Sequence, residues 1–308
     1  MTKLDYHKSA LTTEQQLDKL IQRGLTVENY DDAIQTLTSI SYYRLSAYWY
    51  PFRTRDANGK MTSTIIAGTT FSQIITLYEF DRQLRSLILD AIERVEVATR
   101  TRLTYYMGHK YGSFVHVDPR NFHPTFNHAP WLRKLEGETS RSKDKFIEHY
   151  KNKYSGFPTV PIWMLTEVMS LGSLSLFYKG LQNSQKLGIE DKKAISLHFN
   201  IHHKRLEDWL HTLTYIRNIC AHHGRLWNRE LSIRPDESKD IEWLPPITPR
   251  NDRVFFILLM LRHLLREIGS GDQWSKEITS LLEPISSNTQ FRLSMGIPTD
   301  WKDHPIWK

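Results

Sequence analysis

The chain has 308 residues, of which 40% are hydrophobic, and this is enough for a sizeable core and excludes a disordered or collagen-like protein. Lysine and arginine total 41 against 34 aspartates and glutamates, so the formal net charge is +7, which favours an anionic partner such as nucleic acid. The single cysteine, Cys220, excludes an intramolecular disulfide and a cysteine-based zinc site.

Neither the N-terminus nor the most apolar window indicates a membrane protein. Residues 1–10 mix charged and polar side chains and do not form a signal peptide. The window Val254–Leu265 is interrupted by Arg262 and His263 and is too short to span a bilayer. We therefore expect a soluble, cytoplasmic protein without membrane contact.

The first 66 residues predict two short helices and a hairpin. Thr12 and Thr13 can cap a helix that runs to Arg23, and Asp31 and Asp32 start a second one. The turn signal Asp56–Gly59 predicts a small β-hairpin within residues 52–66. An aromatic cluster surrounds Arg44 before the hairpin: Tyr42, Tyr43, Tyr48, Trp49, Tyr50 and Phe52.

The rest of the chain has helical periodicity. Apolar residues three and four apart predict a long helix from Phe71 to about Met107, on which Glu96 and Arg100 can pair at the surface or face another element. Further helices are expected at residues 131–154, 162–168, 171–181, 191–198, 204–223 and 254–268, and Pro161 marks the start of the second of these. Asn251 and Asp252 offer a cap for the last of these, after an irregular loop at 232–250.

These elements predict an all-α protein of a single domain, residues 1–308. Within it we expect an N-terminal segment at 1–66, a helical core at 67–270 and a C-terminal tail at 271–308. The chain contains no phosphate-binding glycine loop, no H-E-x-x-H and no G-x-S-x-G. His198, His202 and His203 are the best metal ligands, but no carboxylate has matching spacing, so neither a metal nor a cofactor is expected.

The helix at residues 204–223 carries the most informative pattern. Its apolar stripe consists of Leu206, Trp209, Leu213, Ile216 and Cys220. Asn218 lies nearly opposite this stripe, His222 shares its face, and Arg217 lies at the side. Cys220 lies about 200° around the helix from His222, which argues against a Cys–His nucleophilic pair.

An arginine, an asparagine and a histidine without a carboxylate suit the cleavage of RNA by its own 2′-hydroxyl. Histidine moves protons near neutral pH, and arginine stabilises the charge that develops on the phosphate. The amide can hold the phosphate or orient the imidazole. The alternative is a solvated helix end whose histidine interacts favourably with the helix dipole.

The spacing Arg217–Asn218–x–x–x–His222 resembles the R-x4-6-H motif of HEPN ribonucleases. Four blocks, in order, resemble the Abi-like family of bacterial abortive-infection proteins, of the AbiD/AbiF type: residues 40–49, 78–85, 161–172 and 217–229. The resemblance implies a HEPN-like helical bundle and a toxin-like endoribonuclease that arrests growth in phage defence. It also implies a homodimer that combines two motif copies, and restraint by a non-coding RNA or an inhibitor.

On this resemblance, His222 is the general acid or base, Arg217 stabilises the transition state, and Asn218 orients His222 or the phosphate. His223 and Arg225 are weaker candidates for contact with the RNA substrate. Arg44 could hold RNA by stacking and charge, and the basic stretch 133–153 could follow its backbone. Two alternatives are a module that binds structured RNA without cleaving it and a dimeric interaction scaffold.

Overall fold

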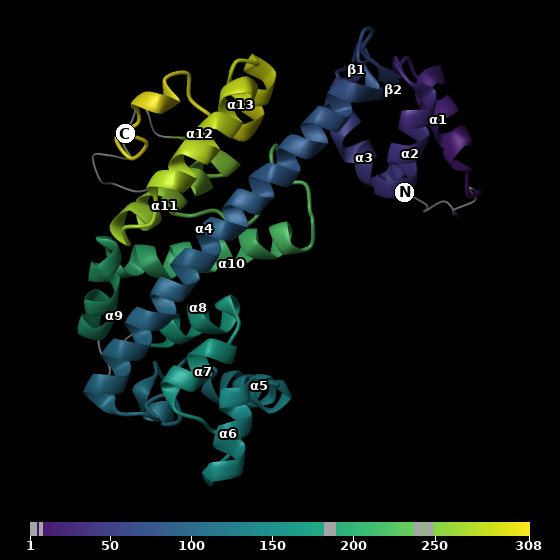
Figure 1. Cartoon of the computed structure of the whole chain (residues 1–308). Coiled ribbons are helices and arrows are strands. Elements are labelled where there is room, and N and C mark those ends of the chain that lie inside the picture. The colour runs from purple at the N-terminus through teal and green to yellow at the C-terminus, as the bar shows by residue number, and fades with distance from the viewer. Residues whose placement is uncertain (1–4, 6–8, 182–188, 237–242, 244–248) are drawn as a thin grey trace. The chain divides into compact units, whose positions relative to one another are not determined.

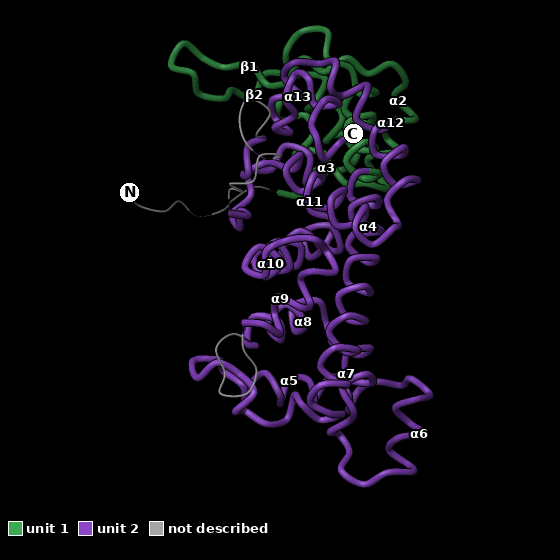
Figure 2. The backbone as a smooth tube through the Cα atoms, turned by 90° about the vertical axis from the view of Figure 1, so that its left-hand side faces the viewer, with its two compact units in different colours: residues 1–83 green, residues 84–308 purple. Residues whose placement is uncertain are grey.

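The computed structural model describes residues 5, 9–181, 189–236, 243 and 249–308. This part of the chain contains thirteen α-helices and one two-stranded hairpin, which confirms the expected all-α fold (Figure 1). The residues group into two compact units, 1–83 and 84–308, with the division inside the long helix α4, Phe71–Tyr111 (Figure 2).

Unit 1 contains the helices α1, Thr13–Gln22, α2, Tyr30–Ile40, and α3, Tyr42–Trp49, followed by the hairpin. Thr12 caps α1 as predicted: its side chain accepts a hydrogen bond from the Gln15 amide, and the Gln15 side-chain oxygen accepts one from the Thr12 amide. Helix α3 contains the first four residues of the aromatic cluster. The hydroxyl of one of them, Tyr48, donates a hydrogen bond to the buried carboxylate of Asp81 at 2.7 Å.

The hairpin is confirmed within the predicted range. Strand β1, Arg53–Arg55, follows the short helix η1, Tyr50–Phe52, and pairs antiparallel with β2, Met61–Ile65. At the turn, the Asp56 carboxylate accepts hydrogen bonds from two backbone amides, those of Asn58 and Lys60, and Gly59 takes a φ of 77°. Such a φ is nearly free of strain only for glycine.

Unit 2 contains the remaining helices, most of them where the sequence predicts them. Their bounds are α5, His128–Arg141; α6, Lys145–Lys153; α7, Ile162–Val168; α8, Leu171–Gly180; α9, Ile189–Ser196; α10, His203–Ala221; α11, Val254–Glu267; α12, Asp272–Ser286; and α13, Thr289–Met295. Short 3₁₀ helices among the described residues of unit 2 include η2, Pro119–Asn121; η3, Leu197–Phe199; and η5, Trp301–Asp303, which follows α13.

Two sequence-based expectations for unit 2 were wrong in detail. Residues 131–154 form two helices, because Ser142 takes an extended conformation at the end of α5. Asp252 does not cap α11, because its carboxylate pairs with Arg250 at 2.7 Å, and the residue at the cap position is Arg253. Most of the expected irregular loop, residues 237–242 and 244–248, lies outside the described residues.

The core of unit 2 forms around α11 and the apolar face of α10. Nearly every residue of α11 is buried, and its His263 ring meets Trp209 of α10 with centroids 5.8 Å apart. Helix α10 also packs against α8 and α9. Within the described residues, no helix combines the length and the hydropathy needed to cross a membrane.

Candidate functional site

Helix α10 presents the two faces that its sequence predicts. The apolar stripe is fully buried: Leu206, Trp209, Leu213, Ile216 and Cys220 are each at most 1% exposed. Asn218 and His222 are exposed, and Arg217 is half-buried at the side. The hydrophobic stripe therefore fixes the rotation of α10, and this rotation turns Asn218 and His222 away from the core.

Arg217, Asn218 and His222 lie together at the C-terminal end of α10. The Arg217 guanidinium donates to the Asn218 side-chain oxygen over 3.3 Å. The His222 backbone amide donates to the Asn218 carbonyl at 3.0 Å, so His222 closes the last turn of the helix. The three predicted catalytic residues thus occupy one exposed helix end, and the Arg217 guanidinium is held beside the side-chain amide of Asn218.

A tight backbone turn follows His222 and ends the helix. The amides of His223 and Gly224 donate to the carbonyls of Cys220 and Ile219, at 3.0 and 2.8 Å, which is the hydrogen-bond pattern of a Schellman motif. Glycine suits position 224, since a Cβ atom there would lie only 3.1 Å from the Ile219 side chain and 3.2 Å from the Ile219 carbonyl oxygen. The turn holds exposed His223 directly beside His222.

Buried side chains anchor the segment after this turn. Leu226 and Trp227 are completely buried, and Trp227 meets Phe291 edge-on with ring centroids 5.3 Å apart. Arg225 is half-buried, and its carbonyl accepts a hydrogen bond from Arg229 at 2.9 Å. Of the two weaker substrate candidates, His223 therefore presents an exposed ring, and Arg225 begins an ordered segment.

Tyr215 and Arg229 belong to this neighbourhood, although the sequence did not single them out. Tyr215 shares the face of Asn218 and His222, because these positions are three and seven residues apart. Its hydroxyl accepts a hydrogen bond from the Ser232 amide over 3.4 Å. Burial raises the pKa of Tyr215, but hydrogen bonds with Ser232 and Arg229 outweigh it and leave the pKa below its usual value. The helical spacing alone could have identified Tyr215.

The Glu96–Arg100 pair has a different role from the surface pair that we expected. Both side chains are largely buried, with 14% and 17% of their surface exposed. Arg100 also donates to the carbonyls of Glu167 and Met169, at 3.0 and 2.7 Å. The pair therefore binds α4 to the C-terminal end of α7, whose last carbonyls would otherwise lack donors.

The remaining sequence candidates do not join the motif in one described cluster. Arg44 is half-buried on α3 in unit 1, whereas the motif lies in unit 2. Of the three histidines considered as metal ligands, His203 is buried in α10. Among the described residues, no three metal-ligating side chains come close enough to hold an ion.

A family model for Abi-like proteins matches residues 35–228, which is more than half of the chain. The chain belongs to the Abi-like protein family. The match includes Arg217, Asn218, His222 and the ordered segment that follows them. Membership in the Abi-like family suggests a role in abortive infection, a defence against phage. Searches of curated proteins and of solved structures gave no significant match.

Proposed function

We propose that this Abi-like protein is a metal-independent endoribonuclease of the HEPN type that arrests growth of the infected cell. The observation that supports this proposal is the end of α10, where an imidazole, an amide and a guanidinium lie together on an exposed face. An exposed site suits a polymeric substrate such as RNA, and the net charge of +7 favours an anionic one.

The proposed reaction uses the 2′-hydroxyl of RNA as the nucleophile. Its oxygen forms a bond to phosphorus as the bond to the 5′-oxygen breaks, which leaves a 2′,3′-cyclic phosphate and a free 5′-hydroxyl. Imidazole at His222 accepts the 2′-hydroxyl proton or donates one to the leaving oxygen. The guanidinium of Arg217, with its fork of parallel N–H donors, binds the charged phosphate oxygens, and Asn218 holds this guanidinium in place.

The reaction needs both a base and an acid, and one motif copy supplies a single catalytic imidazole. We therefore propose that two chains associate through the exposed face of Asn218 and His222 and combine their motifs. A toxic activity of this kind also needs restraint, for which a non-coding RNA or a protein inhibitor is the proposed partner. These features rest on the family resemblance together with the exposure of the motif.

Inducible expression in bacteria tests the proposal directly. Native protein should arrest growth and fragment cellular RNA, whereas His222→Ala should lower cleavage by at least about 100-fold, as expected for loss of a general acid–base group. Arg217→Lys should lower cleavage less, because it retains the charge and loses only the fork. Cleavage by purified native protein should persist in the presence of a chelator.

His149→Ala is the control, because His149 is an exposed histidine on α6, outside the face of α10 that carries His222. It should leave growth arrest unchanged. Equal cleavage by the native and His222→Ala proteins would refute the catalytic assignment. Binding of RNA by purified native protein without cleavage would instead support the alternative of a non-cleaving RNA-binding module.

A further inference from the structure

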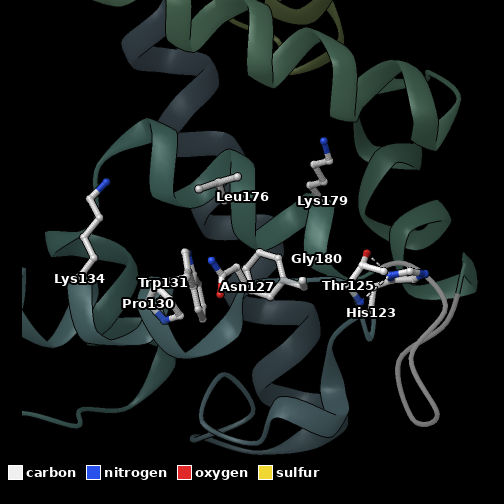
Figure 3. A pocket seen from close by; sticks show the side chains of 10 residues that line it. His123, Thr125, Asn127, Pro130, Trp131, Lys134, Leu176, Lys179 and Gly180 are labelled. Carbon is white, nitrogen blue, oxygen red and sulfur yellow. Dashed lines mark hydrogen bonds between the residues drawn. The ribbon is translucent and has the colours of Figure 1, made fainter.

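A cavity of about 560 Å³ lies between α5 and α8 in unit 2 (Figure 3). Its volume falls within the range of about 300–1,000 Å³ that is typical of ligand sites. None of the residues of the motif at 217–222 lines it. We call it the aromatic cavity, and neither the proposed cleavage nor the family match assigns it a role.

Two aromatic side chains, Phe126 and Trp131, line the cavity and are held firmly in place. Phe126 stacks on buried Phe122, with ring centroids 5.0 Å apart and planes 17° apart. Trp131 packs edge-on against Phe126, and its indole N–H donates to the Ser173 carbonyl at 3.2 Å. Rigid aromatic rings at the wall of an open cavity are suited to stacking a nucleobase.

Two lysines flank these rings and give the cavity a positive rim. Figure 3 shows Lys134 and Lys179 on opposite sides of Trp131, and no carboxylate is among the described residues that line the cavity. Lys134 forms a long ion pair of 3.7 Å with Glu138, on the next turn of α5. Within the described residues, Lys179 has no ion-pair partner. Both ammonium groups can therefore bind a phosphate.

Polar groups at the edge complete the chemistry. Asn127 is exposed and lines the cavity beside Trp131, so its amide can pair with the donors and acceptors of a base edge (Figure 3). The His123 ring forms a 2.7 Å hydrogen bond with the Thr125 hydroxyl, which fixes both at the other end. An aromatic wall, an amide and two ammonium groups together match a base joined to a phosphate.

The charge around a second cavity, of about 490 Å³, distinguishes a free nucleotide in the aromatic cavity from a nucleotide that is part of an RNA strand. This second cavity lies between α8 and α10, shares Leu176 and Lys179 with the aromatic cavity, and is lined by three carboxylates. Lys192 pairs with one of them, Glu207, and Lys204 also lines this cavity, so that Asp208 and Asp236 leave an excess of one negative charge there, apart from the shared Lys179. A strand running from the aromatic cavity across α8 to α10 would meet this charge, so a free nucleotide is favoured.

We propose that the aromatic cavity binds a free nucleotide, with the base on Phe126 beside Trp131 and the phosphate at Lys179. This ligand site goes beyond the proposed ribonuclease activity. On the proposed function, it gives the protein a place, separate from the site for RNA, at which a small molecule can act. Stacking on a preformed surface and charge-assisted hydrogen bonds supply the binding free energy.

Isothermal titration of the full-length His222→Ala protein tests this site independently of cleavage. The probes are the four ribonucleoside 5′-monophosphates and an octauridylate RNA. We expect at least one monophosphate to bind with one site per chain. Lys179→Gln and Leu176→Glu, made in the same background, should weaken binding by at least about tenfold, since each removes or opposes one charge-assisted contact. Both positions are exposed, so folding should be retained.

Lys153→Gln is the control, because Lys153 is an exposed lysine on α6 that does not line the cavity. It should leave the affinity unchanged. The proposal is wrong if no monophosphate binds at millimolar concentration, or if binding is the same in Lys179→Gln and Leu176→Glu. Binding of octauridylate alone, weakened by Leu176→Glu, would overturn the free nucleotide and make the cavity part of an RNA path.

Discussion

His223 takes a left-handed backbone conformation, with a φ of 56°, directly after the proposed catalytic histidine. This conformation costs a residue with a Cβ atom roughly 1–2 kcal/mol, which glycine avoids. His223→Gly should therefore be more stable to unfolding than His223→Ala by about 1 kcal/mol, since both lose the same side chain. Urea unfolding of the two variants measures the difference, and an equal or higher stability of the alanine variant would contradict it.

Individual residues of α10 were predictable because helical geometry alone determines their direction. Cys220 was expected in the core and Asn218 on the opposite face, and both are found there. The contact between Tyr215 and Ser232 was not predictable, because it joins α10 to a loop whose path depends on buried Leu226 and Trp227. Sequence spacing thus identifies the face of the site, and tertiary packing determines its neighbours.

At the scale of helices, Gly180 and Gly137 make a matched pair. A Cβ atom at Gly180 would lie 2.8 Å from the Phe122 ring and 3.1 Å from the Phe126 ring. The end of α8 can therefore lie this close to the two rings only because residue 180 is a glycine. Gly180→Ala should therefore destabilise the protein by about 1–3 kcal/mol, as overpacking does. It should also displace Phe126 and weaken nucleotide binding in the aromatic cavity.

The same change at Gly137, inside α5, should have the opposite effect. The nearest atom to a Cβ there is the flexible Arg141 guanidinium at 3.5 Å, so alanine should stabilise the helix by about 0.5–1 kcal/mol. Thermal unfolding of both variants checks the pair. A gain of stability in Gly180→Ala would show that the rings at the end of α8 are not tightly packed.

Helices were predicted best where a local signal marks their ends. Thr12 and Pro161 begin α1 and α7 as expected. The end of α5 at Ser142 was missed, because no helix-breaking residue marks it. Asp252 was wrongly expected to cap α11, because a neighbouring arginine binds its carboxylate. The aromatic cavity was not predicted, because residues 123–134 and 176–180 come together only through the fold.

The division of the whole chain at residues 83 and 84 also has no sequence signal. It falls inside α4, where neither glycine nor proline interrupts the helical pattern between residues 71 and 107. The all-α composition of both units follows from the apolar periodicity, apart from the hairpin and its turn signal. Local patterns therefore predict what the units are made of, whereas long-range contacts determine where they divide.

Unit 2 buries His116 and His304, and this makes its stability depend on pH. Burial lowers the pKa of each to about 4, and repulsion from His128 contributes at His116. Because the unfolded chain, with a histidine pKa of about 6.5, takes up protons first, stability present above pH 6.5 is lost as the pH falls towards 4. Each of the two histidines should make the free energy of unfolding about 2 kcal/mol lower at pH 5 than at pH 7.

Urea unfolding at pH 7 and pH 5 measures this loss, and His304→Asn separates the contribution of one histidine. The Nδ1 atom of His304 accepts a hydrogen bond from the Ile306 amide at 3.1 Å. The side-chain oxygen of an asparagine can accept the same hydrogen bond, and asparagine does not titrate. The variant should therefore lose about 2 kcal/mol less than the native chain between the two pH values. An equal loss in both proteins would mean that His304 is not buried in its neutral form, and the acid sensitivity would then have to come from other groups.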